Sequence, residues 1–195
     1  MATVQTFWVM RHGRPDLPRN PLFMTRNEFN QYLAAYDEAA LSVQEQDRLQ
    51  RLYRSYPKVD LVIASDLPRA LETAKLFARH DNIIVDPLFR EIPVWLPNDS
   101  TLFLKQRWPG EFWWSYLRFH WFWDQEPEGR TRSTERAREA ISRLEQYQKQ
   151  GPRLAVVSHA GFLLLLINLL QQEHRVSGRR LPHIGFGLPT LYRWR

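Results

Sequence analysis

Two short motifs place a histidine directly after a run of mainly apolar residues. Arg11-His12-Gly13 follows Phe7–Met10, and His159-Ala160-Gly161 follows Leu154–Ser158. Such runs are typical of strands that are buried on both faces of a sheet. Ligands of open α/β sheets bind beyond the carboxyl ends of the strands, which is where both histidines fall. A guanidinium, an imidazole and a glycine that lets backbone approach a ligand together favour binding of an anion such as phosphate.

Two further charged residues fall near the carboxyl ends of predicted strands. Arg69 stands at the start of the helix that follows Asp60–Ser65, and Glu91 lies just past the strand predicted at 82–85. If the strands that end at the two histidines are neighbours, the imidazoles face each other across one crevice. Arg69 would then supply a second fork-shaped cation for phosphate oxygens, the helix after His159 would offer free backbone N–H groups, and Glu91 would place a carboxyl group at the rim.

Each of these residues also has an ordinary structural interpretation. Arg69 could be a surface residue of its helix, Glu91 one half of an exposed ion pair, and His159 a hydrogen-bonded core histidine. All three structural interpretations together require unrelated coincidences at three strand ends. The joint arrangement therefore favours an anion site at the carboxyl edge of the sheet.

The elements that must position these residues alternate along the chain. Strands are predicted at residues 7–10, 60–65, 82–85, 154–158 and 188–194, and Pro189 favours an edge position for the last. Helices are predicted from Thr25 to about Ala40, from Ser42 to before Pro57, after Pro68, around residues 137–144 and after Gly161. Capping boxes at the starts of the first two helices pair Thr25 with Glu28 and Ser42 with Glu45. This order predicts an α/β protein, a three-layer α/β/α arrangement with a mostly parallel sheet, as a single domain over residues 1–195.

An aromatic-rich insertion at about residues 95–125 interrupts this pattern. Its tryptophans are Trp95, Trp108, Trp113, Trp114, Trp121 and Trp123. The favoured interpretation is a pair of helices that pack aromatic side chains onto the domain. The alternative is a lid whose rings exclude water and shape the pocket for a leaving group.

Composition limits the classes of function. The 195-residue chain has a net charge of +6, and residues 171–195 hold five arginines against Glu173 as the one acidic residue. A basic tail more often forms a solvated face or lines a phosphate site than binds nucleic acid, so nucleic acid is unlikely as a partner. There is no cysteine, which excludes disulfides and thiolate metal sites. No apolar run approaches the roughly 18 residues of a membrane span, and without a visible signal peptide we expect a cytoplasmic protein.

The motifs, taken in order, resemble a known family. VMRHG, SDLPRALETA, FREI and VVSHAG, between Phe7 and about Leu170, are similar to the motifs of the histidine phosphatase superfamily, which is phosphoglycerate mutase-like, in its branch of small phosphatases. The resemblance implies a phosphoglycerate mutase-like fold and a phosphatase that acts on a phosphorylated small molecule. It implies neither a metal nor another cofactor.

The resemblance also implies a role for each site residue. His12 would be the nucleophile that forms a phosphohistidine, Arg11, Arg69 and His159 would hold the phosphate oxygens, and Glu91 would protonate the leaving oxygen. The residues expected to contact the substrate are Gly13, Arg14, Asn20, Ala160 and Gly161. A metal site made of the two histidines and Glu91 lacks local ligand spacing and is not favoured.

The sequence also departs from the family pattern. Pro15 and Pro18 stand where a small hydroxyl residue and an asparagine are usual, so Arg14, Arg19 or Asn20 would have to replace them. No long insertion of the kind that mutases use is visible, which favours a phosphatase. Two alternatives stay open: a mutase-like phosphotransferase that uses the same phosphohistidine, and a catalytically silent module that binds a phospholigand or RNA.

Overall fold

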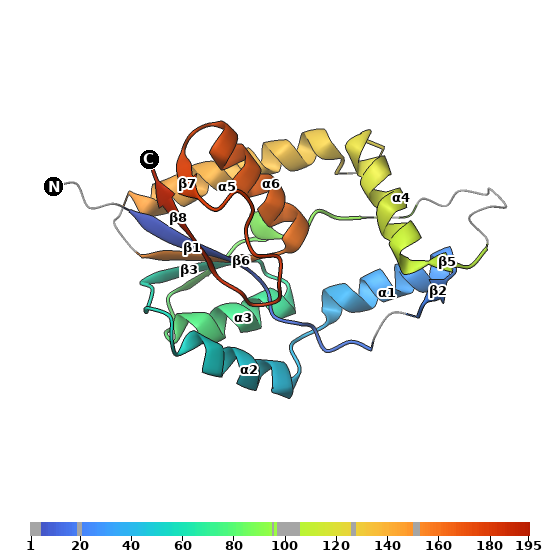
Figure 1. Ribbon diagram of the computed structural model, residues 1–195, viewed down its shortest axis with the longest axis horizontal. Helices are drawn as coiled ribbons and strands as arrows, with labels where there is room; N and C mark the ends of the chain where they lie inside the picture. The colour runs from blue at the N-terminus through green and yellow to red at the C-terminus, as the bar shows by residue number, and fades with distance from the viewer. Residues whose placement is uncertain (1–4, 19–20, 95, 97–105, 126–127, 150–152) are drawn as a thin grey trace.

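The computed structural model describes residues 5–18, 21–94, 96, 106–125, 128–149 and 153–195 (Figure 1). In this part of the chain, a six-stranded sheet has the order β4-β3-β6-β1-β8-β7. Its strands are β1 (Thr6–Arg11), β3 (Leu61–Ala64), β4 (Ile83–Val85), β6 (Leu154–Ser158), β7 (Val176–Gly178) and β8 (Thr190–Trp194). The first four are mutually parallel, whereas β8 pairs antiparallel with β1 and β7 antiparallel with β8. The predicted mostly parallel sheet is confirmed.

Helices cover both faces of this sheet, with α5 and α6 on one face and α2 and α3 on the other (Figure 1). Successive residues of β6 point to opposite faces: Val156 packs in a cluster with Phe162 of α6, and Val157 packs with Phe77 of α3. The predicted three-layer arrangement is therefore confirmed. The helices described are α1 (Arg26–Glu38), α2 (Val43–Tyr53), α3 (Pro68–Ala78), α4 (Gly110–Phe122), α5 (Arg130–Gln148) and α6 (Ala160–Gln172). A 3-10 turn lies at Pro87–Phe89. A separate two-stranded antiparallel sheet consists of β2 (Phe23–Met24) and β5 (Trp108–Pro109).

Capping residues decide where α1 and α2 begin. Thr25 and Glu28 form the predicted reciprocal capping box, with the Glu28 N–H donating to the Thr25 hydroxyl and the Thr25 N–H donating to the Glu28 carboxylate. The box predicted at Ser42 forms only in part. The Ser42 hydroxyl accepts the N–H of Glu45, but the Glu45 carboxylate instead accepts the backbone N–H of Arg14 at 2.8 Å. The Glu45 side chain therefore holds the loop that follows β1 and does not complete the cap of α2.

The edge of the sheet differs from the prediction. β8 is not an edge strand, because β7 pairs along its outer side. Pro189 does not interfere, since it precedes the first strand residue, Thr190, and its missing donor removes no ladder hydrogen bond. The short β7, at Val176–Gly178, was not predicted because three residues between charged segments carry almost no periodic signal.

The aromatic-rich insertion packs against α1. Its described part, residue 96 and residues 106–125, contains one helix, α4, where a pair was expected. Trp113 is fully buried and lies in one apolar cluster with Phe29 of α1, as the packing interpretation predicts. Trp95 and residues 97–105 lie outside the described residues.

α6 is apolar nearly all round because it is covered on most sides. Leu163, Leu166 and Ile167 are all buried in the cluster shared with α5 and the sheet. In the described ranges, no helix has the length and apolarity required to cross a membrane.

The capping box of α1 generates a stability prediction. Thr25→Ala removes the acceptor for a first-turn N–H group and should lower the free energy of unfolding by about 1 kcal/mol in chemical denaturation. Thr134→Ala is the matched control, because the Thr134 hydroxyl donates to the Arg130 carbonyl within α5 and satisfies no helix-end donor. The control should change stability by less than about 0.5 kcal/mol. Equal effects of the two substitutions would contradict a role for the cap.

Candidate active site

The pairing of β1 with β6 brings the two histidines together. The strands are parallel neighbours in which Arg11 lies opposite Ser158, and the backbone N–H of His12 donates to the Ser158 carbonyl at 2.9 Å. Each histidine is thus the first residue beyond its strand at the same edge of the sheet. The ring centroids of His12 and His159 are 4.9 Å apart. The two strands are neighbours, as the prediction required, and the two buried rings lie side by side at this edge of the sheet.

Hydrogen bonds select the tautomer of His12. Its Nδ1 lies 2.6 Å from the carbonyl oxygen of Gly13, and because a carbonyl only accepts, Nδ1 carries the proton. Nε2 accepts a hydrogen bond from the Nε of Arg69 at 3.3 Å. The neutral ring therefore keeps its lone pair on Nε2, the nitrogen on the side of the arginine.

The same guanidinium selects the tautomer of His159. Nη2 of Arg69 lies 3.4 Å from Nδ1 of His159, and a guanidinium can only donate. Nε2 of His159 lies 2.9 Å from the hydroxyl oxygen of Ser65, so this nitrogen carries the proton and donates to Ser65. One arginine thus contacts the unprotonated nitrogen of both imidazoles.

Burial and cations keep both imidazoles neutral. The pKa of His12 lies well below its ordinary value of 6.5, first because burial removes water from the charged form and then because His159, Arg69 and Arg11 repel an imidazolium. The hydrogen bond to the Gly13 carbonyl raises the pKa of His12, but by less than burial and the neighbouring charges lower it. Burial and the nearby arginines lower the pKa of His159 in the same way. A neutral His12 is the form that can act as a nucleophile.

Helix α1 holds Arg69 in place. Arg69 is fully buried, and its Nη1 donates to the carbonyls of Tyr36 and Asp37 at 2.6 and 3.2 Å. Nη2 also forms an ion pair with the Asp37 carboxylate at 3.1 Å. The guanidinium carbon lies 4.4 Å from the ring centroid of Tyr36. Its orientation is therefore set by the C-terminal turn of a helix far from it in the sequence.

Arg11 is held by a tyrosine and a phenylalanine. Nη2 donates to the Tyr36 hydroxyl and Nη1 to the carbonyl of Ile184, both at 3.1 Å. The guanidinium carbon lies 3.9 Å from the ring centroid of Phe186. Nε of Arg11 is buried and has no hydrogen-bond partner among the described residues. A buried donor left without a partner at this place fits an anion that completes the site.

Glu91 occupies the start of α6. Its carboxylate accepts the backbone N–H of Phe162 at 2.9 Å and that of Gly161 at 3.2 Å. A Cβ at position 161 would lie 2.8 Å from the carboxylate, so a larger residue would displace the Glu91 side chain from this position. The free N–H groups expected after His159 are thus partly taken by Glu91, and Gly161 contacts the carboxylate.

Of the predicted substrate-contacting residues that the structure describes, only Gly13 forms a hydrogen bond with His12 or His159, since its carbonyl contacts Nδ1 of His12. Gly13 donates its N–H to the Thr73 hydroxyl at 2.8 Å, and a Cβ there would lie 2.7 Å from the side chain of Leu49. Arg14 is exposed, and Ala160 is the first residue of α6. Arg19 and Asn20 lie outside the described residues. Within the described ranges, no three His, Asp or Glu side chains come close enough together to hold a metal ion.

The sequence matches the histidine phosphatase superfamily (branch 1) over residues 7–188. The chain belongs to this superfamily. No curated protein matches the sequence significantly. The family predicted from the four motifs is confirmed.

Solved structures of several phosphatases are similar to this structure over most of the chain. Alpha-ribazole phosphatase from Shigella flexneri matches with a TM-score of 0.60 and 19% identity, over 98% of this chain and 95% of that one. Phosphoserine phosphatase from Entamoeba histolytica, solved with 3-phosphoglyceric acid, has a TM-score of 0.60 and 16% identity, over 96% and 89%. A mycobacterial glucosyl-3-phosphoglycerate phosphatase has a TM-score of 0.55 and 16% identity, over 87% and 80%. The shared fold is phosphoglycerate mutase-like, as the sequence predicted.

Sequence reasoning missed three residues of this histidine phosphatase site. Ser65 holds His159, and its position at the end of a predicted strand was the available signal. Tyr36 contacts both arginines, but a tyrosine on a helix is ordinarily core or surface. Phe186 lies 5.7 Å from the ring of His12, whereas His183 of the same loop instead contacts Arg179. The loop around Gly185 and Gly187 thus reaches the site through its aromatic residue, Phe186.

The lowered pKa values of the histidines generate a pH prediction. Between pH 6.5 and 5 the unfolded chain binds protons at His12 and His159 that the folded chain does not, so the free energy of unfolding should fall as pH falls, by up to about 1.4 kcal/mol per pH unit for each histidine. Ordinary carboxyl groups titrate mainly below this window.

The measurement is chemical denaturation at several pH values across this window. The double variant His12→Asn/His159→Asn is the control and should show a shallower slope. An unchanged slope in the double variant would contradict neutral buried imidazoles.

Proposed function

We propose that this histidine phosphatase superfamily member is a metal-independent phosphomonoester hydrolase that works through a phosphohistidine on His12. One observation carries the proposal. The Gly13 carbonyl holds the Nδ1 proton of His12, which leaves the lone pair on Nε2, where it accepts the Nε–H of Arg69 and where Arg11 is near enough to disfavour an imidazolium. A neutral nucleophile beside fixed cations suits attack on a phosphate group.

The first step transfers the phosphoryl group to the enzyme. Nε2 of His12 attacks phosphorus, a P–N bond forms as the P–O ester bond breaks, and the bonding electrons stay with the ester oxygen. Glu91 enters this step as the carboxylic acid, gives its proton to the ester oxygen so that the alcohol leaves neutral, and becomes the carboxylate that accepts the N–H groups of α6. Arg11, Arg69 and His159 stabilise the charge on the three remaining phosphate oxygens.

The second step restores the enzyme. Water attacks the phosphohistidine, the P–N bond breaks, and its electrons return to Nε2. Glu91, now a carboxylate, accepts the proton from the attacking water. Inorganic phosphate leaves. Cations rather than a metal ion supply the neutralising charge, and they are already fixed by Tyr36, Asp37 and Phe186.

Replacing the nucleophile tests this function. His12→Asn should lower the rate of phosphate release from 4-nitrophenyl phosphate by at least about 10³-fold, because an asparagine amide has no nucleophilic lone pair to replace that of Nε2. Rapid quench of the wild-type protein followed by mass spectrometry should find the phosphoryl group on His12.

The matched control is His174→Asn. His174 is exposed and has a φ of 56°, a backbone conformation that asparagine accepts. This variant should keep wild-type activity. Activity retained by His12→Asn, or phosphate trapped on another residue, would overturn the proposal. Formation of a phosphorylated isomer in place of inorganic phosphate would indicate a mutase instead.

A further inference from the structure

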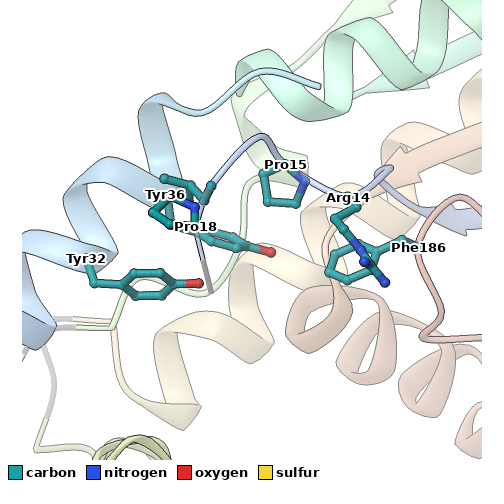
Figure 2. Close-up of a pocket in the computed structure, with 7 residues that line it drawn as sticks. Arg14, Pro15, Pro18, Tyr32, Tyr36 and Phe186 are labelled. Atoms are coloured by element: carbon teal, nitrogen blue, oxygen red, sulfur yellow. The ribbon is translucent and has the colours of Figure 1, made fainter. Parts of the chain in front are cut away.

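A pocket lined by rings lies beside His12. It has a volume of about 360 Å³, and its walls include Pro15, Pro18, Tyr32, Tyr36 and Phe186. Figure 2 shows the two tyrosines of α1 on one side and Phe186, with Arg14 beside it, on the other. Volumes of this order are typical of small-molecule sites. The opening between α1 and the loop before β8 is therefore large enough for a substituted ring.

The pocket adjoins the predicted nucleophile. The ring centroid of His12 lies 6.0 Å from that of Tyr36 and 5.7 Å from that of Phe186. A phosphate bound at Nε2 would direct its ester oxygen away from His12, because the nucleophile and the leaving oxygen are in line in phosphoryl transfer. The groups attached to that oxygen would be close to the two rings.

The walls are fixed before any ligand binds. Arg11 donates to the Tyr36 hydroxyl and also lies over the ring of Phe186, so one guanidinium holds both aromatic walls. Tyr32 packs against Tyr36 with ring centroids 6.0 Å apart. Rigid rings bind a flat partner at a low cost in conformational entropy.

The arginines near the pocket lie against its rings. Arg11 is engaged by Tyr36 and the carbonyl of Ile184, and the Arg14 guanidinium carbon lies 5.7 Å from the Phe186 ring, within reach of a cation–π contact. The nearby carboxylate of Glu45 is paired with Arg48. The greater part of the wall is aromatic or proline ring.

We propose that the preferred substrates are aryl or arylmethyl phosphomonoesters, whose ring lies between the α1 tyrosines and Phe186. The inference rests on the proposed function, since it uses His12 as the point of attack. The short separation between His12 and both aromatic walls favours a ring bonded to the ester oxygen directly or through one carbon. The chemistry is that of any phosphomonoester: the P–O bond breaks, the ester oxygen takes the proton of Glu91, and the aromatic alcohol and inorganic phosphate are the products.

Benzyl phosphate and cyclohexylmethyl phosphate form the test pair. Both release a primary alcohol of similar size and acidity, but only benzyl alcohol has a flat π-face. The wild-type protein should hydrolyse benzyl phosphate with a kcat/KM about tenfold higher, as stacking against two rings implies. A ratio near one, or one that favours the saturated ring, would overturn the inference and leave the phosphatase function standing.

Variants assign the preference to the pocket. Tyr32→Leu and Phe186→Leu should each move the benzyl-to-cyclohexylmethyl ratio toward one, whatever their effect on the absolute rates. Phe119→Leu is the control, because Phe119 is an exposed aromatic residue of α4 that does not line the pocket. A wild-type ratio in both pocket variants would contradict stacking at these rings.

A binding measurement separates the two proposals. Benzylphosphonate and cyclohexylmethylphosphonate cannot be hydrolysed, and their affinities can be compared by titration calorimetry. About tenfold tighter binding of benzylphosphonate, lost in Phe186→Leu, would support the ring pocket even if no phosphate ester were turned over. In that case the proposed function alone would fail. Equal affinities of the two phosphonates would overturn the ring pocket.

Discussion

The buried guanidinium of Arg69 is the interaction on which the site depends. A charged group with no exposed surface is costly unless its donors are paired, and here each nitrogen has a partner. The partners are both imidazoles, the carbonyls at the end of α1 and the Asp37 carboxylate. The same contacts keep the imidazoles neutral and orient the lone pair of His12. Arg69 therefore links the two histidines at the edge of the sheet to the C-terminal turn of α1.

The position of α1 consequently matters for the chemistry, and the aromatic insertion supports it. Phe29 on α1 is buried in one cluster with Trp113 of α4, while Tyr32 and Tyr36 of the same helix line the pocket. The described part of the insertion thus packs against the helix whose carbonyls hold Arg69. The rings that border the pocket come from α1 and from the loop before β8, which explains how one arginine, Arg11, can hold both walls.

The sequence by itself determined the local features. Apolar runs that stop at His12 and His159, a capping box at Thr25 and Pro68 at the start of α3 depend on residues close together in the chain, so their patterns predict strands and helix ends directly. The alternation of these elements was sufficient for the three-layer fold. Four motifs in order were sufficient for the histidine phosphatase superfamily.

Only the tertiary structure decided how these pieces meet. That β1 lies beside β6, that Glu91 caps α6 and that Phe186 stacks on Arg11 are contacts between residues distant in sequence, and no local period encodes them. Tyr36 and Ser65 are common residue types whose roles come solely from which atoms lie within hydrogen-bond distance. The aromatic lining of the pocket also comes from two segments that are distant in sequence, α1 and the loop before β8. Both contact Arg11, and only the packing of the folded chain brings them together.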